Sequence, residues 1–303
     1  MSNRHDTKML QTSAADKRGT MRNPTFSLEV FPPKRTAPIG TIYDTMDGLQ
    51  GIKPDFISVT YGTGKSTDRT ATARIANTIR AEYGIESVAH LTAQYLDRNG
   101  VDQALEMFKQ AGVSAVLALR GDTIEGAQPA NIFCHASDLV EYIAQSGTDF
   151  DIYAACYPEK HPQASSLDED LDNLKKKVDC GVNRLISQLF YDNEDFFRFL
   201  DAARDKQIDV PIEAGIMPVT NVHSVKRMAK MCGARIPEKV RVLLDKWGSD
   251  PDSLKTAGVI YACEQISDLV ANGVDGIHLY SMNHPGVTRR IWSNVYSLFA
   301  ERL

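Results

Sequence analysis

The chain has 303 residues, of which 43% are hydrophobic and 24% charged, and it carries a formal net charge of −5. This composition is typical of a globular protein with a large buried core, and it excludes the fibrous and the largely disordered classes. The acidic balance lacks the basic field that binding to a nucleic-acid backbone requires. The five cysteines stand far apart without a C-x-x-C pair, so we expect a reducing compartment, the cytoplasm, and no metal site.

Residues 1–24 are mostly polar, and the longest apolar stretch among them is Met9-Leu10. The segment resembles neither a secretory signal nor a membrane anchor. We therefore expect a flexible N-terminal tail over residues 1–24, followed by one catalytic domain over residues 25–303. An arm that binds a partner is the alternative for the tail.

Eight short apolar runs then alternate with helix-length segments. The runs cover residues 26–31, 55–61, 87–92, 115–120, 151–157, 184–190, 210–216 and 276–282. Their nearly continuous apolar character favours parallel strands that are buried on both faces. Eight strand–helix units close most economically into an α/β fold of the (β/α)₈ TIM barrel type, as a single domain. A doubly wound open sheet is less favoured, because the first run is followed by PPKRT instead of a glycine-rich turn.

The intervening segments carry helix signals. Ser166 and Glu169 have the spacing of a capping box, which predicts a helix that ends near Gly181. Other helical patterns lie at 101–112, around 221–232, around 235–272 and at 287–302. The two patterns between the seventh and the eighth run predict a helical insertion instead of a second domain.

The second run leads into YGTGKST at residues 61–67, which resembles the end of a phosphate-binding loop. The complete pattern needs a glycine five residues before Gly64, where this chain has Val59. A P-loop module that binds a nucleotide through Lys65 therefore remains an unfavoured alternative.

Polar residues gather where the predicted strands end, and in such barrels these ends carry the chemistry. Glu29 lies inside an apolar run, and because a carboxylate is costly to bury, we favour a functional role over an ion pair with Arg120 or a lysine. His90, taken alone, fits a structural histidine better than a functional one. The remaining candidates are Thr60, Tyr61, Arg120, Gly121, Asp122, Tyr157, Glu159, His161 and Gln188.

Seven ordered motifs between residues 26 and 290 carry a family likeness. They are FSLEVFPPK, SVTYG with its glycine-rich loop and DRT, AHLT, ALRGD, AACYPEKHP, LKKKVDCGVNRLISQLFYD and GIMPV. In these motifs the chain resembles the methylenetetrahydrofolate reductase family. The resemblance implies a (β/α)₈ barrel that binds FAD and reduces 5,10-methylenetetrahydrofolate to 5-methyltetrahydrofolate with NADH or NADPH. It also makes YGTGKST a variant of the family's glycine-rich loop.

The resemblance implies roles for individual residues. Glu29 matches the general acid, which protonates the aminobenzoyl nitrogen when the five-membered ring of the substrate opens. Asp122 matches an aspartate that contacts the pterin and tunes the flavin, Gln188 a residue that contacts folate and nicotinamide, and Thr60 one near the nicotinamide. The positions that match the lining of the FAD site, besides Asp122 and Thr60, are Tyr61, His90, Arg120, Gly121, Ala136, Tyr157, His161, Ala164, Asp170, Asn173, Lys176 and Lys177.

Two positions depart from the family pattern. His284 stands where the family commonly has an arginine or a lysine for the folate tail, and it is a weaker cation. Met228 stands where the family can place a phenylalanine against the nicotinamide. The second departure and the N-terminal tail keep an alternative open, in which the flavin barrel is a subunit of an electron-transfer complex and takes electrons from a protein partner. A folate-binding barrel without redox activity and a homo-oligomer also stay open.

Overall fold

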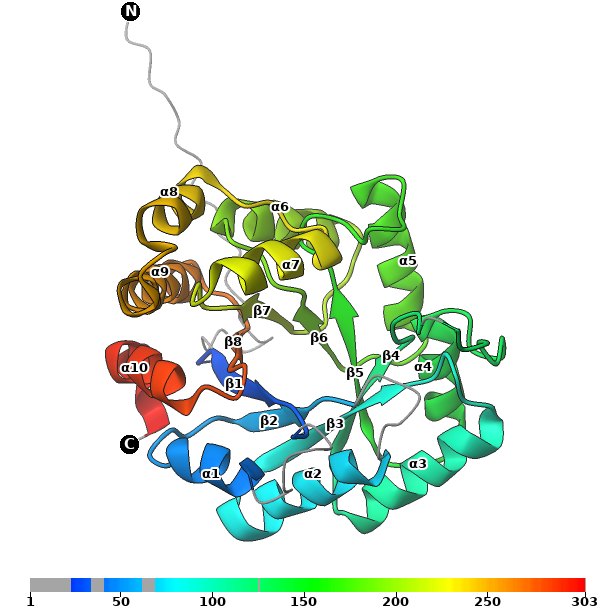
Figure 1. Cartoon of the computed structure of the whole chain (residues 1–303). Coiled ribbons are helices and arrows are strands. Elements are labelled where there is room, and N and C mark those ends of the chain that lie inside the picture. The colour runs from blue at the N-terminus through cyan, green and yellow to red at the C-terminus, as the bar shows by residue number, and fades with distance from the viewer. Residues whose placement is uncertain (1–22, 34–40, 62–68, 125, 303) are drawn as a thin grey trace, which may run out of the picture.

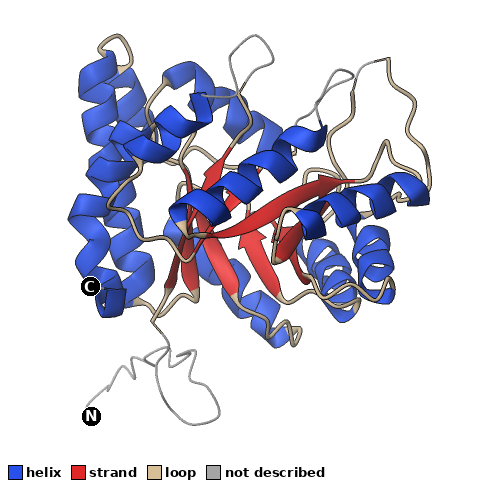
Figure 2. Ribbon diagram, turned by 90° about the horizontal axis from the view of Figure 1, so that it is seen from below, coloured by secondary structure: helices blue, strands red, loops and turns tan. Residues whose placement is uncertain are grey.

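The computed structural model describes residues 23–33, 41–61, 69–124 and 126–302. Within this part of the chain, eight parallel strands close into a ring in sequence order, and helices surround the ring (Figure 1). Figure 2 shows the strands at the centre and the helices around them. The predicted (β/α)₈ barrel is therefore confirmed. The glycine-rich segment after Tyr61, including Lys65, and nearly all of the predicted tail lie outside the described residues.

Each strand lies inside a predicted run or begins one residue before it, and the runs extend up to three residues beyond the strand ends. The strands are β1 Thr25–Val30, β2 Phe56–Val59, β3 Glu86–Thr92, β4 Ala115–Leu119, β5 Asp151–Cys156, β6 Arg184–Ser187, β7 Ile212–Ile216 and β8 Gly276–Tyr280. The helices of the described residues are α1 Thr41–Gly48, α2 Arg69–Tyr83, α3 Arg98–Gln110, α4 Ala136–Gln145, α5 Leu167–Asp179, α6 Asn193–Asp205, α7 Val222–Cys232, α8 Glu238–Trp247, α9 Pro251–Ala271 and α10 Pro285–Val295.

The long helical pattern at 235–272 is two helices, α8 and α9, so the prediction of one stretch is wrong. Pro251 opens α9, where its missing N–H group is no loss and its fixed φ suits a helix. The side chain of Asp250 caps this new start and accepts hydrogen bonds from the backbone N–H groups of Asp252 and Ser253, both at 3.2 Å. The last predicted helix is also shorter, because α10 ends at Val295 and a 3₁₀ segment, Tyr296–Arg302, follows.

The predicted start of α5 is confirmed. The hydroxyl of Ser166 accepts a hydrogen bond from the N–H of Glu169 at 3.1 Å. In a capping box, the carboxylate accepts a hydrogen bond from the N–H of the cap residue, here Ser166. The carboxylate of Glu169 instead accepts from the N–H of the preceding residue, Ser165, at 2.8 Å. This double cap fixes the beginning of the helix that carries Asp170 and Lys177.

Alternate residues of the strands face two different environments. Outward residues of β1 pack against the surrounding helices, and the ring of Phe26 lies 4.7 Å from that of Trp292 on α10. The barrel interior holds a small apolar cluster that includes Phe56, Leu117 and Ile186. The remaining inward positions are free to carry polar side chains, and the strand ends open onto one face.

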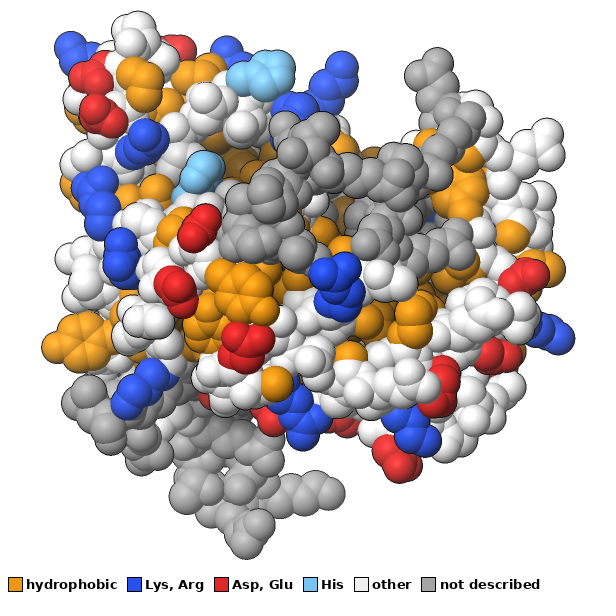
Figure 3. All heavy atoms as spheres, turned by 60° about the horizontal axis from the view of Figure 1, so that its bottom comes forward, with side chains coloured by type: hydrophobic (Ala, Val, Ile, Leu, Met, Phe, Trp, Pro, Cys, Tyr) orange, Lys and Arg blue, Asp and Glu red, His pale blue; other side chains and the backbone are white. Residues whose placement is uncertain are grey.

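The surface in Figure 3 carries interspersed basic and acidic side chains, with no large field of one sign on this face. No helix in the described ranges has the length and the apolar character needed to cross a membrane.

Candidate active site

Glu29 lies near the end of β1, with its side chain inside the mouth of the barrel and 14% exposed. Its Oε2 atom lies 3.6 Å from Nε2 of His90 on β3 and 3.9 Å from Nε2 of His278 on β8. In the described part of the chain, the ion-pair partners of Glu29 are these two histidines, and neither Arg120 nor a lysine is among them. A carboxyl group at a barrel mouth with imidazole neighbours suits proton transfer better than structural pairing.

His90 is buried, and its Nε2 atom has no hydrogen-bond partner among the described residues. Burial lowers the pKa of His90 to about 4, because the imidazolium would lose its hydration, although the nearby Glu29 carboxylate opposes this change. His90 is therefore neutral at physiological pH.

This lowered pKa predicts how stability depends on pH. Unfolded histidine binds a proton near pH 6.5 and folded His90 does so only near pH 4, so the free energy of unfolding falls as the pH drops through this window. The full effect is up to about 3 kcal/mol. Urea unfolding at about pH 7.5 and about pH 5 measures how much unfolding free energy is lost between the two, and this loss should be smaller for His90→Gln than for the unmodified protein. His223→Gln, which changes an exposed histidine of α7, should keep the original loss. Equal losses in all three proteins would contradict the prediction.

A second group of predicted residues surrounds the loop after β5. The rings of Tyr157 and His161 meet edge to face, with their centroids 4.7 Å apart. The backbone N–H of His161 donates a hydrogen bond to Oδ2 of Asp170 at 2.8 Å. The ammonium group of Lys160 donates to the carbonyl oxygen of Ala164 at 2.6 Å, which folds this loop onto itself.

Charged side chains surround these two rings. Burial lowers the pKa of His161, and the positive charges of Arg120 and Lys177 lower it further, while Asp170 opposes them. Burial raises the pKa of Tyr157 to about 12, with smaller contributions from neighbouring groups that include Asp122. These electrostatic interactions indicate that the predicted residues after β4, after β5 and on α5 lie near one another on one side of the barrel mouth.

Three groups in this region are suited to an anionic cofactor. The ammonium group of Lys177 is anchored on the carbonyl oxygen of Ala155 at 2.6 Å, and Arg120 donates to Oε1 of Gln163 at 2.7 Å. Gly121 has φ +97°, and a Cβ atom there would lie 2.9 Å from Cβ of Thr92, so only glycine leaves this backbone open. Two cations and a bare backbone segment match the needs of a bound pyrophosphate.

Tyr280 interacts both with the group around Glu29 and with the group around Tyr157 and His161. It is in register with Glu29, and its hydroxyl donates a hydrogen bond to the carbonyl oxygen of Ser187 at 2.8 Å. Burial raises the pKa of Tyr280 well above its ordinary value, and the charges of Glu29 and Tyr157 act in the same direction. The Glu29 group and the Tyr157 group are therefore neighbours at the barrel mouth.

The turn after β8 is held against the end of β1. Met282 and Asn283 both have positive φ, at 51° and 52°, a conformation that is strained for residues other than glycine. The side chain of Asn283 accepts from the N–H of Phe31 at 3.0 Å and donates to the carbonyl oxygen of Phe31 at 2.9 Å. This pair of hydrogen bonds compensates for the strain and directs the chain toward exposed His284 at the start of α10.

The remaining predicted residues lie at other positions around the barrel. The carboxamide of Gln188 folds back and accepts from the N–H of Leu189 at 2.8 Å, and the carbonyl oxygen of Thr60 accepts from Thr72 at 3.0 Å. Met228 is half-buried in an apolar cluster that also contains Met217 and Tyr280. Asn173 and Lys176 are exposed on α5, Ala136 begins α4 half-buried, and Tyr61 is buried beyond the end of β2.

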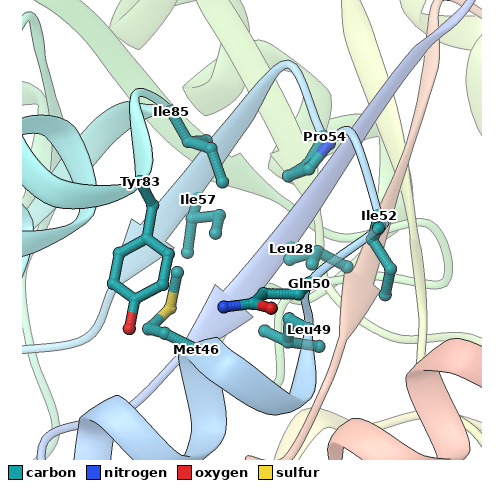
Figure 4. A pocket seen from close by; sticks show the side chains of 10 residues that line it. Leu28, Met46, Leu49, Gln50, Ile52, Pro54, Ile57, Tyr83 and Ile85 are labelled. Atoms are coloured by element: carbon teal, nitrogen blue, oxygen red, sulfur yellow. The ribbon is translucent and has the colours of Figure 1, made fainter. Parts of the chain in front are cut away.

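A cavity of about 160 Å³ lies away from these residues, between α1, β1 and the start of β2 (Figure 4). Its lining is mostly apolar, and Glu29 is not part of it. Tyr83, whose hydroxyl donates to Asp47 at 2.8 Å, borders the cavity, which has no convergent catalytic groups. Over the described residues, no group of three His, Cys, Asp or Glu side chains is arranged to hold a metal ion.

Sequence reasoning missed several polar residues that lie below Glu29 inside the barrel. They are Thr25, Ser27, Arg184, Glu213 and His278. A signal was present, since Thr25, Ser27 and Glu29 alternate with apolar residues and strand residues two apart face the same side.

Comparisons with known proteins bear on the family and on the fold. The family model described as methylenetetrahydrofolate reductase matches residues 14–296. The 5,10-methylenetetrahydrofolate reductase of Pectobacterium carotovorum is 37% identical over 90% of each chain, and that of Escherichia coli K12 is 36% identical over 90% of each chain. A solved structure of an uncharacterized Clostridium thermocellum protein, described as binding two copies of 5-methyl-5,6,7,8-tetrahydrofolic acid, aligns with a TM-score of 0.63. It covers 91% of this chain and 95% of that one at 14% identity, which supports the fold alone.

Proposed function

The chain belongs to the methylenetetrahydrofolate reductase family, and from that premise we propose that it reduces 5,10-methylenetetrahydrofolate to 5-methyltetrahydrofolate with bound FAD and with NADH or NADPH as electron donor. The observation that carries the proposal is the position of Glu29. A carboxyl group stands at the mouth of the barrel, where the loops after the strands admit a substrate, with His90 and His278 beside it.

Glu29 donates the proton that the reaction needs. The five-membered ring of the substrate opens when its aminobenzoyl nitrogen is protonated, which leaves an iminium carbon ready to accept hydride. Since His90 is neutral, it adds no positive charge that would favour the ionised form of Glu29. In the proposed reaction, the carboxyl group of Glu29 passes its proton to the substrate nitrogen.

FAD bound at this site would supply the hydride chemistry of the reaction. The residues proposed to hold it are those around the Tyr157 and His161 rings. Arg120 and Lys177 supply positive charge for the pyrophosphate, and Gly121 allows the backbone to approach the cofactor. Asp170 orders the loop after β5 by accepting from the N–H of His161.

The substrate contacts follow from the family likeness and remain proposals. Asp122 contacts the pterin and tunes the flavin, and Gln188 contacts folate and nicotinamide in turn. Thr60 lies near the nicotinamide. His284, which is exposed at the start of α10, faces the folate tail and binds its carboxylates more weakly than an arginine would. The cytoplasm is the proposed place of action.

A visible absorption spectrum of the purified protein tests the proposal, followed by anaerobic addition of NADH and then NADPH in one cuvette. We expect flavin absorption bands that bleach with one of the two nucleotides, which would identify the donor, and re-oxidation on adding methylenetetrahydrofolate. Protein with neither flavin nor affinity for added FAD would contradict the proposal.

A second candidate function keeps the same flavin site but changes the electron source. It is favoured by Met228, which stands where the family can place an aromatic ring against the nicotinamide. In that case the flavin bands persist with both nucleotides and bleach only with a reduced protein partner. Dithionite reduction followed by folate-dependent re-oxidation would show that the folate reaction itself is intact.

A further inference from the structure

The barrel interior below Glu29 is polar where such interiors are usually apolar. Ser27, Glu213 and His278 are completely buried there. Ser27 is in register with His278 across the β1–β8 pair, and Glu213 lies on the neighbouring strand, β7. Buried polar groups are costly unless each has partners, so their mutual contacts define how this interior works.

Glu213 is the fixed point of this group. Its Oε1 atom accepts from Nη1 of Arg184 at 2.8 Å and from the hydroxyl of Thr25 at 2.7 Å. Because a guanidinium is always protonated and pairs with a carboxylate, Glu213 is ionised and can only accept hydrogen bonds.

The hydroxyl of Ser27 lies between Glu213 and His278. Its oxygen makes a short hydrogen bond with Oε2 of Glu213 and lies 2.7 Å from Nδ1 of His278. The carbonyl oxygen of Ile277, at 3.3 Å, is another acceptor. Since a hydroxyl has a single proton and these oxygens are acceptors, Ser27 donates toward an oxygen, and Nδ1 of His278 must donate to Ser27.

This direction fixes the tautomer of His278. A neutral imidazole with its proton on Nδ1 presents a lone pair on Nε2. Nε2 of His278 has no hydrogen-bond partner among the described atoms, and it lies 3.9 Å from Oε2 of Glu29. This separation is longer than a hydrogen bond, so the two groups act on each other electrostatically. An ionised Glu29 would face the lone pair with like charge, which favours the neutral carboxyl form.

We propose that His278 is a positioning residue, held as the Nδ1–H tautomer by Ser27, Glu213 and Arg184, and that its Nε2 lone pair keeps the Glu29 carboxyl group in the protonated, proton-donating form. The inference rests on the proposed function, in which Glu29 is the acid. It adds a specific role for three buried residues below the reaction centre.

The groups that face these two side chains are few in the described part of the chain. His278 is surrounded by Ser27 and Glu29 of β1, Glu213 of β7, and the rings of Phe56 on β2 and Tyr280 on β8. His90 interacts with both Glu29 and His278 and is neutral. Arg184 acts through Glu213, whose charge it balances. Removing the Ser27 hydroxyl therefore removes the contact that fixes the tautomer of His278, and it leaves the Arg184–Glu213 pair in place.

The test compares Ser27→Ala with the unmodified holoenzyme. The first readout is the ¹⁵N NMR spectrum of histidine-labelled protein, which separates protonated from unprotonated ring nitrogens. We expect a protonated Nδ1 and an unprotonated Nε2 for His278 in the unmodified enzyme, and a mixture or the opposite tautomer in Ser27→Ala. An unmodified enzyme with the proton on Nε2 would overturn the proposal, whatever the variant does.

The second readout is the pH profile of folate reduction by the pre-reduced enzyme. In Ser27→Ala, the pH at which the rate falls on the alkaline side should be about one unit lower. The rate should therefore be about tenfold lower at mildly alkaline pH and nearly unchanged at acidic pH. Flavin reduction by the nucleotide should be unchanged. An unchanged profile, or an equal loss at every pH, would overturn the proposal.

Ser87→Ala is the matched control. Ser87 is also a completely buried serine of the barrel, and its hydroxyl has no hydrogen-bond partner among the described residues. It is in register with Ile57, which packs in the outer core, so it lies on the side away from Glu29. This variant should keep both the tautomer and the profile. Failure of the proposed function looks different, because then Glu29→Gln would also retain folate reduction.

Discussion

Glu29→Gln protein is expected to bind FAD and to accept electrons from its donor, yet to reduce methylenetetrahydrofolate roughly 10²- to 10⁴-fold more slowly. Glutamine keeps the size of the side chain at the barrel mouth, so the cofactor site is undisturbed. It cannot supply a proton to the aminobenzoyl nitrogen, so the substrate ring stays closed. Anaerobic stopped-flow measurement of the two half-reactions separates the expected loss from the expected retention.

Glu86→Gln provides the control for this experiment. Glu86 is an exposed carboxylate at the opposite end of the barrel, at the start of β3, and it accepts a hydrogen bond from Ser114 at 2.9 Å. Its replacement should leave both half-reactions near their original rates. Near-normal folate reduction by Glu29→Gln would show that another group is the acid.

Gly258→Ala is expected to have the largest effect on stability. Gly258 is buried in α9, and a Cβ atom there would lie 1.8 Å from the carbonyl oxygen of Val219, in the segment after β7. The helix and this segment must separate to admit a methyl group, which costs about 3 kcal/mol of unfolding free energy. Urea unfolding, followed by circular dichroism, measures the change directly.

Gly286→Ala is the opposite case. Gly286 is exposed in α10, and a Cβ atom there would have no neighbour within 4 Å. Alanine restricts the unfolded chain and favours the helix, so we expect a gain of about 0.5 kcal/mol. If both variants were equally stable, the close approach of α9 to Val219 would not exist in solution.

The barrel could be predicted from the sequence because its strands are short and apolar and are separated by segments of helix length. Parallel strands buried on both faces leave that pattern whatever their function. The break between α8 and α9 was missed, although Asp250 and Pro251 are a helix-start signal, because the apolar pattern continues on both sides of it.

The candidate site was only partly accessible to the same reasoning. Glu29 stood out because it interrupts an apolar run. Ser27, Glu213 and His278 did not, although Ser27 and Glu29 are two positions apart and therefore face the same side of their strand. Their partners lie on strands far away in the sequence, so no local spacing indicates that Ser27 connects a histidine to a carboxylate. The roles of residues such as Ala136 and Asn173 came from the family likeness alone, and they stay predictions.

The pairing of β1 with β8 has a consequence for synthesis of the protein. Ser27 and His278 are 251 positions apart, and the two hydrogen bonds between Asn283 and Phe31 join the same two regions. Contacts of such long range form late, because the whole intervening chain must first be ordered. A ribosome therefore synthesises Glu29 among the first residues. The strand that carries its neighbour His278 follows only after nearly all of the remaining chain has been made. A chain interrupted before β8 would contain every residue from Glu29 to Gln188 and still lack a reaction centre.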